Sequence, residues 1–323
     1  MTEVPSQLTW DVYVTTEEPI VTDDLAPGAT ERRWPPISAT LISAGRDAVL
    51  VDPLMTAAQA RGLGDWIAAS GKNLTAVFVT HGHGDHWLGL SVILDRFPGS
   101  RAFAVPGVVE KMRRSSTPEY LAAVWNPRLP GKIADRIVLA DPLPGHVLDL
   151  EGHQLVAVEL GHTDTDTTSC LHVPEIGLVL GGDAVYNDVH LHLSESDHKG
   201  RLDWLAALRT IESLHPKAVV AGHKRATRDD DPRIIGKPAS TSVTSTGSPK
   251  RRPPHATSTT KSSNSTRTAS TPARCGRQLA SLSHNGPSCS PAACGTKSPP
   301  PAPQHPRPQA AASSGPGGRG YEY

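Results

Sequence analysis

The sequence of 323 residues has few cysteines and no long hydrophobic run. Only one of its four cysteines, Cys170, lies before residue 237, which fits a reducing compartment. No stretch approaches the roughly 18 apolar residues of a membrane-spanning helix. Residues Met1–Gln7 have neither the basic nor the apolar region of a secretory signal. We therefore expect a cytoplasmic protein that does not enter a membrane.

Positive charge is scarce in most of the chain. Of the 32 Lys and Arg residues, eleven lie in residues 237–323, which contain a single acidic residue, Glu322. Residues 1–236 therefore hold 21 basic and 31 acidic side chains, a net charge of −10. Because nucleic-acid binding depends on Lys and Arg contacts to phosphate, this acidic body argues against a polyanion and favours a small-molecule substrate.

The sequence is rich in metal-binding side chains at one place, His81-Gly82-His83-Gly84-Asp85-His86. This segment directly follows the apolar run 74–79, which is typical of a short buried strand. Histidine is the commonest metal ligand near neutral pH, and aspartate adds the negative charge that a divalent ion requires. Ligands in a turn after a strand lie at the edge of a sheet, where a site can open to substrate.

Three further candidate ligands lie far downstream, each just after an apolar run and a glycine. They are His162, Asp183 and His223. One loop cannot surround an ion, so neighbouring strands must deliver the remaining ligands to the same edge. The runs that precede them are 154–160, 177–180 and 217–221.

The order H-x-H-x-D-H, then H, then D, then H resembles the metallo-β-lactamase-fold hydrolase superfamily over residues 36–236. The resemblance implies an α/β fold, a four-layer αββα sandwich with the site at one edge of its two sheets. It also implies two metal ions. The first would be held by His81, His83 and His162. The second would be held by Asp85, His86 and His223, with Asp183 bridging the two.

This ligand set predicts a hydrolase. A neutral three-histidine site matches hydrolytic zinc enzymes. Two ions roughly 3.5–4 Å apart can share a water, lower its pKa to give a bridging hydroxide, and stabilise an oxyanion. No serine or cysteine nucleophile is then needed; the sequence has no G-x-S-x-G motif, and Cys170 fits a buried structural thiol. We expect a zinc enzyme acting on a small ester, lactone, thioester or amide.

Two residues are expected to take part in catalysis beyond holding metal. Asp85 would steer the bridging water. The segment Asp183-Ala184-Val185-Tyr186 is similar to the D-A-x-Y of acyl-homoserine-lactone hydrolases, which implies that Tyr186 donates to the oxyanion or the leaving oxygen. A tyrosine packed under the loop is the alternative. Residues 163–168 depart from the usual GHT-x-G-S/H pattern, so the subfamily stays open, glyoxalase-II-type thioesterases included.

Two other functions stay open. The same ligands can hold iron in redox relatives such as flavodiiron proteins and persulfide dioxygenases, and manganese is a further possibility. The chain could also bind metal without turnover. The missing export signal argues against a true β-lactamase, and the oligomeric state is unknown.

The remaining patterns indicate alternating strands and helices. Segments 112–144 and 186–198 are expected to line the substrate pocket, where His190 and His192 could lie unless they belong to a solvated loop.

The leucine-rich stripe of the last helix is predicted to face the core: Leu202, Leu205, Leu208, Ile211 and Leu214. Five other histidines are interpreted as structural or surface residues: His146, His153, His172, His198 and His215. The predicted strands are 37–43 and 48–52, and the predicted helices are 56–70, 86–97, 107–114, 118–124 and 202–214.

The composition divides the chain into three parts: an N-terminal strand or extension (1–35), the metallo-β-lactamase-like domain (36–236) and a tail (237–323). The tail is rich in Ser, Thr, Pro, Ala and Arg and holds 14 of the 30 prolines, which is typical of disorder. A reading-frame shift near Gly236 is the interpretation we favour, because a shifted frame can encode a plausible amphipathic helix over 237–250. Cys275, Cys289 and Cys294 have no zinc-ligand spacing and receive no role.

Overall fold

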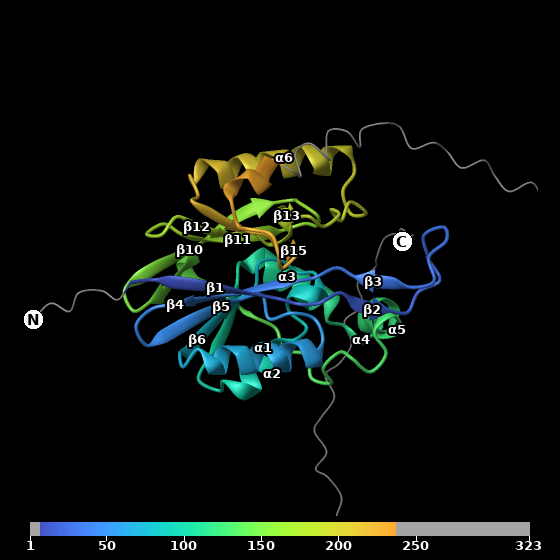
Figure 1. Cartoon of the computed structure of the whole chain (residues 1–323), viewed down its shortest axis with the longest axis horizontal. Coiled ribbons are helices and arrows are strands. Elements are labelled where there is room, and N and C mark those ends of the chain that lie inside the picture. Colours follow the sequence, from blue (N-terminus) through green and yellow to red (C-terminus); the bar gives the residue numbers. More distant parts are fainter. Residues whose placement is uncertain (1–6, 237–323) are drawn as a thin grey trace, which may run out of the picture. The chain divides into compact units, whose positions relative to one another are not determined.

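Two β-sheets form the centre of residues 7–236, the part of the chain that the computed structural model describes (Figure 1). The first sheet contains, in spatial order, β1 (Thr9–Val14), β4 (Ser38–Ser43), β5 (Asp47–Val51), β6 (Asn73–Phe78), β7 (Arg101–Ala104) and β8 (Asp141–Pro142). The second contains β14 (Ala218–Val220), β12 (Leu178–Leu180), β11 (Thr168–Val173), β10 (His153–Gly161) and β9 (Val147–Leu150). Two short pairs are separate: β2 (Glu18–Ile20) with β3 (Arg32–Trp34), and β13 (Tyr186–Asn187) with β15 (His223–Lys224).

Helices cover the outer faces of both sheets. The helices α1 (Ala57–Ala69) and α2 (Leu90–Arg96) lie against the first sheet, and α6 (His198–Ser213) lies against the second (Figure 1). The helix α3 (Pro106–Ser115) contacts β8 of one sheet and β11 of the other. The short helices α4 (Pro118–Tyr120) and α5 (Asn126–Arg128) follow it, joined by a π-helical turn over Leu121–Trp125. This arrangement confirms the predicted αββα sandwich.

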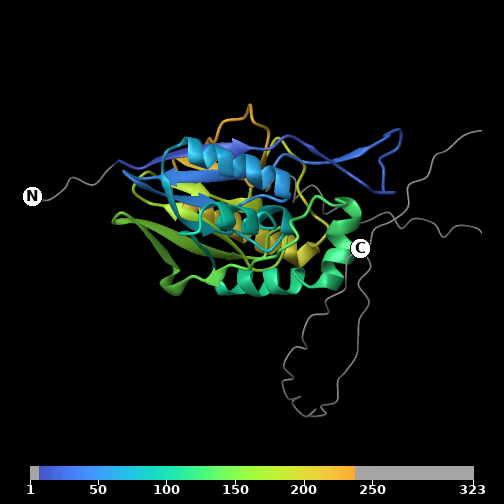
Figure 2. The ribbon, with the colours of Figure 1, turned by 90° about the horizontal axis from the view of Figure 1, so that it is seen from below.

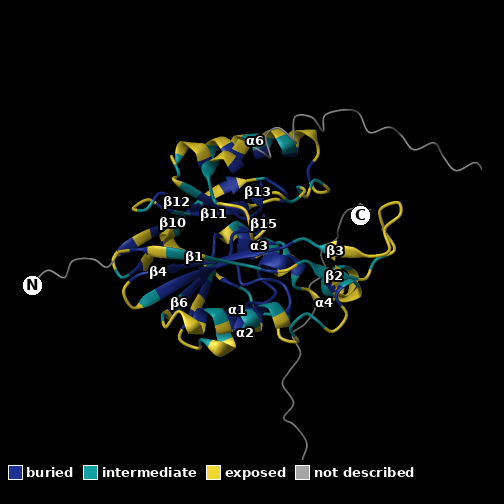
Figure 3. Cartoon of the chain, viewed as in Figure 1, coloured by how far each residue is buried: buried dark blue, intermediate teal, exposed yellow. Residues whose placement is uncertain are grey.

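The strands nearest the middle of the first sheet are buried on both faces, as Figure 3 shows in dark blue. All six residues of β4 are buried, and β5 to β8 run parallel to one another. Parallel strands covered by layers on both sides require mainly apolar side chains, which residues 48–51 of β5 and 76–78 of β6 supply. The buried first sheet therefore supports the residues that follow the ends of its strands.

The helix α1 follows the predicted signals closely. Thr56 is its N-cap, and the Thr56 hydroxyl accepts from the backbone N–H of Gln59 while the Gln59 side chain accepts from Thr56 N–H. This reciprocal capping box satisfies two of the free N–H groups at the helix start. The helix ends at Ala69, and Gly71 takes a left-handed conformation two residues later, with φ +69°.

Two helices begin elsewhere than predicted. The helix expected over 86–97 begins only at Leu90, because Gly84–His86 form a 3₁₀ turn that keeps the ligand side chains on the site. The helix expected over 202–214 begins four residues earlier, at His198, because the Asp197 carboxylate accepts from Gly200 N–H at 2.8 Å and caps it.

The prediction that the whole leucine stripe of α6 faces the core was wrong. Leu208 and Ile211 are buried, but Leu202 is 53% exposed. A spacing of three residues rotates by about 60° per step against the helical period of 3.6, so a long stripe turns away from the core at its ends. The buried face centres instead on Trp204, Leu208 and Ile211.

The segment before residue 36, expected to be a strand or an extension, contains three strands. The strand β1 is an edge strand of the first sheet and pairs antiparallel with β4. The hairpin of β2 and β3 projects from one end of the molecule, beside the segment of α4 and α5 (Figure 2). The tail, 237–323, for which we predicted disorder from a frame shift, lies outside the described residues. No helix among residues 7–236 is long and apolar enough to cross a membrane.

Candidate metal centre

Six of the seven predicted ligands gather where the strands of both sheets end. The His81–His86 segment follows β6 of the first sheet, Asp183 follows β12 of the second, and His223 begins β15 directly after β14. An isolated bridge between Ile37 and His223 holds the last of these against the first sheet. The two sheets therefore share one edge at which histidines and carboxylates meet.

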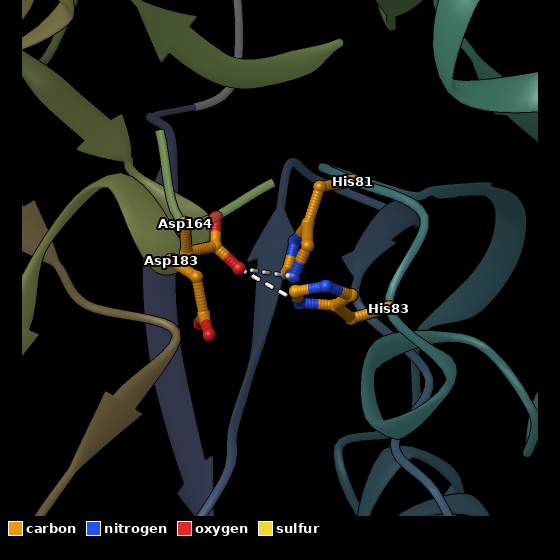
Figure 4. Close-up of side chains that lie close together, drawn as sticks. All are labelled: His81, His83, Asp164 and Asp183. Atoms are coloured by element: carbon orange, nitrogen blue, oxygen red, sulfur yellow. Dashed lines mark ion pairs between the residues drawn. The ribbon is translucent and has the colours of Figure 1, made fainter. Parts of the chain in front are cut away.

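One group of ligands surrounds His81 and His83, as Figure 4 shows. Asp164 Oδ2 lies 2.7 Å from His83 Nδ1 and 3.8 Å from His81 Nε2. Asp183 belongs to the same group, and its carboxylate lies beside that of Asp164 (Figure 4). All four ligand atoms lie within 4.8 Å of one another, which is close enough for one ion to contact them together.

A second group contains Asp85, His86 and His223. Asp85 Oδ2 lies 3.1 Å from His223 Nε2 and 3.6 Å from His86 Nε2. Asp183 extends to this group as well, since its two oxygens lie 3.2 Å from His86 Nε2 and 3.4 Å from His223 Nε2. Asp183 thus stands between the two groups, the position expected of a bridging carboxylate.

The structure does not bring His162 into either group. Its Nδ1 lies 2.7 Å from Asp166 Oδ1, and its Nε2 lies 2.8 Å from the hydroxyl of Ser196. Asp164 stands in the first group instead, completely buried. The resemblance had placed His162 there; in this structure both imidazole nitrogens of His162 already have protein partners, so a ligand role would require them to separate.

Asp52 orients His86 directly and His81 through the hydroxyl of Thr80. Its Oδ2 lies 3.1 Å from His86 Nδ1 and accepts from the Thr80 hydroxyl at 2.8 Å. The same hydroxyl lies 3.0 Å from His81 Nδ1. Histidines that bind metal usually give their other ring nitrogen to a carboxylate, hydroxyl or carbonyl, which fixes the ring. The inner nitrogens of His81 and His86 are held facing the site in this way.

The other two histidines are fixed by the same principle. His223 Nδ1 lies 2.9 Å from the carbonyl of Pro36, and His83 Nε2 lies 2.9 Å from Glu195 Oε1. Glu195 is held in turn by the Thr165 hydroxyl at 2.6 Å and by Lys111 Nζ at 3.1 Å. Each imidazole therefore has one nitrogen anchored to the protein and one facing the carboxylates of the centre.

Unpartnered buried atoms test whether these residues fit a metal ion. Four buried side-chain atoms of the centre face one another at ion-pair distances but form no well-oriented hydrogen bond: His81 Nε2, His86 Nε2, Asp164 Oδ2 and Asp183 Oδ1. Leaving a buried polar atom unpaired costs roughly 1–3 kcal/mol, so a concentration of such atoms needs an explanation. Nitrogen and carboxylate oxygen are the donors that zinc takes, so the residues fit a divalent cation.

The charges of the centre also favour a bound divalent cation. Burial alone would lower the pKa of His83 and of His223, but the nearby Asp164 and Asp183 raise them to about 10 and about 9 respectively. Burial would raise the pKa of Asp183, yet His223 and His86 hold it well below its usual value. A site that draws protons onto buried imidazoles also attracts a divalent cation, which would displace them.

The two glycines of the motif are required for close packing. Neither Gly82 nor Gly84 has a positive φ. A Cβ on Gly82 would lie 2.3 Å from Lys111 Cγ, and one on Gly84 would lie 2.6 Å from the indole of Trp125. The loop therefore packs directly against Lys111 and against Trp125, and Trp125 belongs to the segment that we expected to line the pocket.

Tyr186 lies in the centre and is 2% exposed. Its hydroxyl donates to Asp183 Oδ2 at 2.6 Å, and its ring stacks on His223 with centroids 5.6 Å apart. Burial and then the charge of Asp183 raise the pKa of Tyr186 well above its usual value, so the phenol stays protonated and remains a donor. Tyr186 is thus buried beside Asp183, a position that fits both the packed tyrosine and the proton donor considered from the sequence.

Of the two histidines after β13, only His192 approaches the centre. Its ring lies 5.4 Å from that of His83, edge to face, and it forms a possible ligand group with His83 and Glu195. Both His190 and His192 are exposed. His190 fits the solvated-loop interpretation, and His192 lies at the rim of the site.

Sequence reasoning missed several residues of the centre. Asp52 follows the buried run 48–51, so the pattern of a strand followed by a ligand could have found it. Asp164 was visible as the unusual acid two residues after His162. Glu195 carried no local signal, because it reaches His83 from 112 residues away.

Two packed sheets with buried histidines and aspartates at their common edge define an α/β sandwich with a candidate metal site. The chain belongs to the metallo-β-lactamase superfamily, whose family model matches residues 32–223. The match covers both ligand groups, from the His81–His86 segment to His223. No curated protein matches the sequence.

Solved structures of the same fold are similar at low sequence identity. The crystal structure of VMB-1 is 15% identical, with a TM-score of 0.53 over 74% of this chain and 98% of that chain. A metallo-β-lactamase from Pontibacter korlensis is 18% identical, with a TM-score of 0.52 over 73% and 99%. The metallo-β-lactamase FIM-1 from Pseudomonas aeruginosa, in its mono-zinc form, is 15% identical, with a TM-score of 0.51 over 76% and 98%. These similarities establish the fold.

Proposed function

We propose that the protein is a metal-dependent hydrolase of a small carbonyl substrate: an ester, lactone, thioester or amide. The observation that carries the proposal is the set of unpartnered buried atoms on His81, His86, Asp164 and Asp183. His81, His83, Asp164 and Asp183 would hold one ion. Asp85, His86 and His223 would hold a second, with Asp183 shared. Two zinc ions are the default, and iron or manganese suit the same nitrogen and oxygen donors.

When bound, a divalent pair supplies a Lewis acid and an activated water at neutral pH. The chain's own residues fix the geometry around it. Asp52 and Glu195 hold His86 and His83 by their outer ring nitrogens. Tyr186 keeps its proton and donates to Asp183. A small rotation of that phenol would let the same proton reach a substrate oxygen, the donor role that we propose for Tyr186.

Three buried side chains of the described residues that could act as nucleophiles are hydrogen-bonded to backbone carbonyls or unreactive. Ser38 donates to the carbonyl of Ala221, and Ser169 donates to the carbonyl of Thr80. Cys170 is buried, and burial raises the pKa of its thiol to about 12. Because the thiolate is the reactive form, Cys170 is not a nucleophile at neutral pH. This supports attack by water rather than by a residue of the chain.

The residues around the centre favour a neutral or weakly charged substrate. Within the segment expected to line the pocket, Arg113 and Arg114 pair with Glu110, and Arg128 donates to a backbone carbonyl. Lys111 pairs with Glu195. With these cations engaged and a body charge of −10, an acyl substrate is favoured over a phosphodiester or a nucleic acid.

Metal analysis and a substrate panel test the proposal. The zinc-loaded protein should hold two ions per chain and should turn over lactones or aryl esters faster than bis(4-nitrophenyl) phosphate. Asp85→Ala should cost activity far more than folding. Only trace metal after zinc loading would refute the metal centre. Survival of activity within about tenfold in Asp85→Ala, roughly 1.4 kcal/mol of barrier, would refute the role of Asp85.

Purification without added metal distinguishes the alternatives. Iron retained in place of zinc, with oxygen consumption and no ester turnover, would favour a redox member of the fold. Bound metal with no turnover on any substrate class would indicate a metal-binding protein that is not an enzyme.

A further inference from the structure

A tryptophan from the N-terminal hairpin contacts the centre although its segment carries no ligand. The indole Nε1 of Trp34, at the end of β3, donates to Asp85 Oδ2 at 2.9 Å. The same oxygen faces Nε2 of His223 and of His86, at 3.1 Å and 3.6 Å. A carboxylate oxygen that already accepts from a fixed donor cannot rotate freely, so Trp34 restricts how Asp85 meets the two imidazoles.

Packing holds the Trp34 ring in place. Its ring lies 5.3 Å from that of Trp125, at an angle of 58°. Trp125 is 4% exposed and fills the space where a side chain on Gly84 would lie. Because Gly84 directly precedes Asp85, the tryptophan pair contacts both the backbone and the carboxylate of this part of the loop.

The hairpin that carries Trp34 is itself anchored to the segment of Trp125. Glu18 Oε1 lies 2.5 Å from Lys132 Nζ, and Val21 N–H donates to the carbonyl of Arg128 at 2.9 Å. The indole donor is therefore placed by contacts at both ends of the β2–β3 pair and does not depend on one flexible side chain.

We propose that Trp34 is a positioning residue of the metal centre, whose indole N–H holds the Asp85 carboxylate in the orientation that faces His86 and His223. This inference rests on the proposed metal centre. Partners that orient metal ligands typically contribute a factor of about 10–100 to metal affinity. A single neutral donor on one ligand of the second group should contribute about tenfold, and only to that group.

Trp34→Phe tests the donor while keeping an aromatic ring against Trp125. Zinc binding to the metal-free protein is measured by competition with a chromophoric chelator, which resolves the two stepwise dissociation constants. Trp34→Phe should weaken one step about tenfold and leave the other within twofold. Trp66→Phe is the matched control, since Trp66 lies in α1 and packs on Tyr13 of β1, and both of its binding steps should equal those of the unaltered protein.

Two results would overturn the inference in different ways. If the unaltered protein does not bind two zinc ions, the metal centre itself fails. If it binds two and Trp34→Phe binds both equally well, only the positioning role fails. The unaltered, ¹⁵N-labelled protein gives a second measurement if the variant does not fold. The indole N–H of Trp34 should then exchange slowly with water, and rapid exchange would also refute its contact with Asp85.

Discussion

Asp52 Oδ2 lies 3.1 Å from Nδ1 of His86, and Asp52 holds this position with a left-handed backbone conformation, φ +59°. Such a conformation is unfavourable for any residue with a side chain, by roughly 1–3 kcal/mol, and persists where the surroundings require it. Here the requirement is visible, because the same carboxylate also accepts from the N–H and the hydroxyl of Thr80.

We predict that Asp52→Ala lowers zinc affinity by about 10–100-fold, because His86 and Thr80 lose the partner that fixes them. Chelator competition measures the effect. His215→Ala is the control, since His215 also has a positive φ, 49°, but is exposed on the loop after α6. Equal zinc affinity for Asp52→Ala and the control would show that the carboxylate does not orient the ligands.

Matched substitutions can show whether Asp164 or His162 is the metal ligand in the first group. Asp164→Asn should remove one zinc equivalent or weaken it by more than tenfold, since Asp164 is the buried carboxylate nearest to His81 and His83. His162→Asn should change zinc binding by less than threefold, because its imidazole is engaged by Asp166 and Ser196. The opposite ranking would restore the histidine expected from the sequence.

Removing metal should destabilise the protein, because the unpartnered atoms of the centre would then stay unpaired. At a free zinc concentration of about 100 times the dissociation constant, binding stabilises the folded state by about 2.7 kcal/mol per site. For a domain of this size that corresponds to a rise in melting temperature of roughly 5–10 °C. Differential scanning fluorimetry with zinc or with a chelator measures it. Asp183→Asn should lose most of the shift; a full shift in that variant would mean that zinc binds elsewhere.

Cys170 should resist thiol reagents in the folded protein. With a pKa of about 12, only ~1 in 10⁴ of these thiols is ionised at pH 8, and the side chain is completely buried. Alkylation with iodoacetamide, mapped by peptide mass spectrometry, should leave Cys170 unmodified until guanidinium is added. Labelling of Cys170 under native conditions at the rate seen in guanidinium would contradict its burial.

Two leucines of the α6 stripe, Leu208 at its middle and Leu202 at its start, should differ sharply in their effect on stability. Leu208→Ala should cost roughly 2–5 kcal/mol of unfolding free energy, the usual range for a buried leucine. Leu202→Ala should cost less than about 0.5 kcal/mol, because Leu202 is half exposed. Chemical denaturation of both variants measures the difference, and comparable losses would support the original core-facing interpretation of the stripe.

The fold and most of the candidate metal ligands could be predicted because their signals are local. A buried run, a turn and a ligand are contiguous in the chain, and this pattern precedes His81, Asp183 and His223. The structure brings all seven predicted ligands except His162 into the two groups. The exception depends on how the loop after β10 folds, which the spacing of residues does not encode.

Residues that act from outside the ligand groups could not be predicted in this way. Trp34 reaches Asp85 across 51 residues, and Glu195 reaches His83 across 112. Such contacts depend on how a hairpin and a loop pack on the finished sandwich. Helix boundaries were also inaccurate, because the cap at Asp197 and the 3₁₀ turn at Gly84–His86 outweighed the apolar periodicity.

The contact between His223 and Pro36 has a consequence for synthesis of the chain on the ribosome. The two residues are 187 positions apart, and Ser38 donates to the carbonyl of Ala221 across a similar span. The first sheet can form while translation continues, but the His81–His86 segment then has neither Asp183 nor His223 beside it. Ions that arrive during translation would meet an incomplete set of donors, so tight binding would have to wait until the last strands have left the exit tunnel.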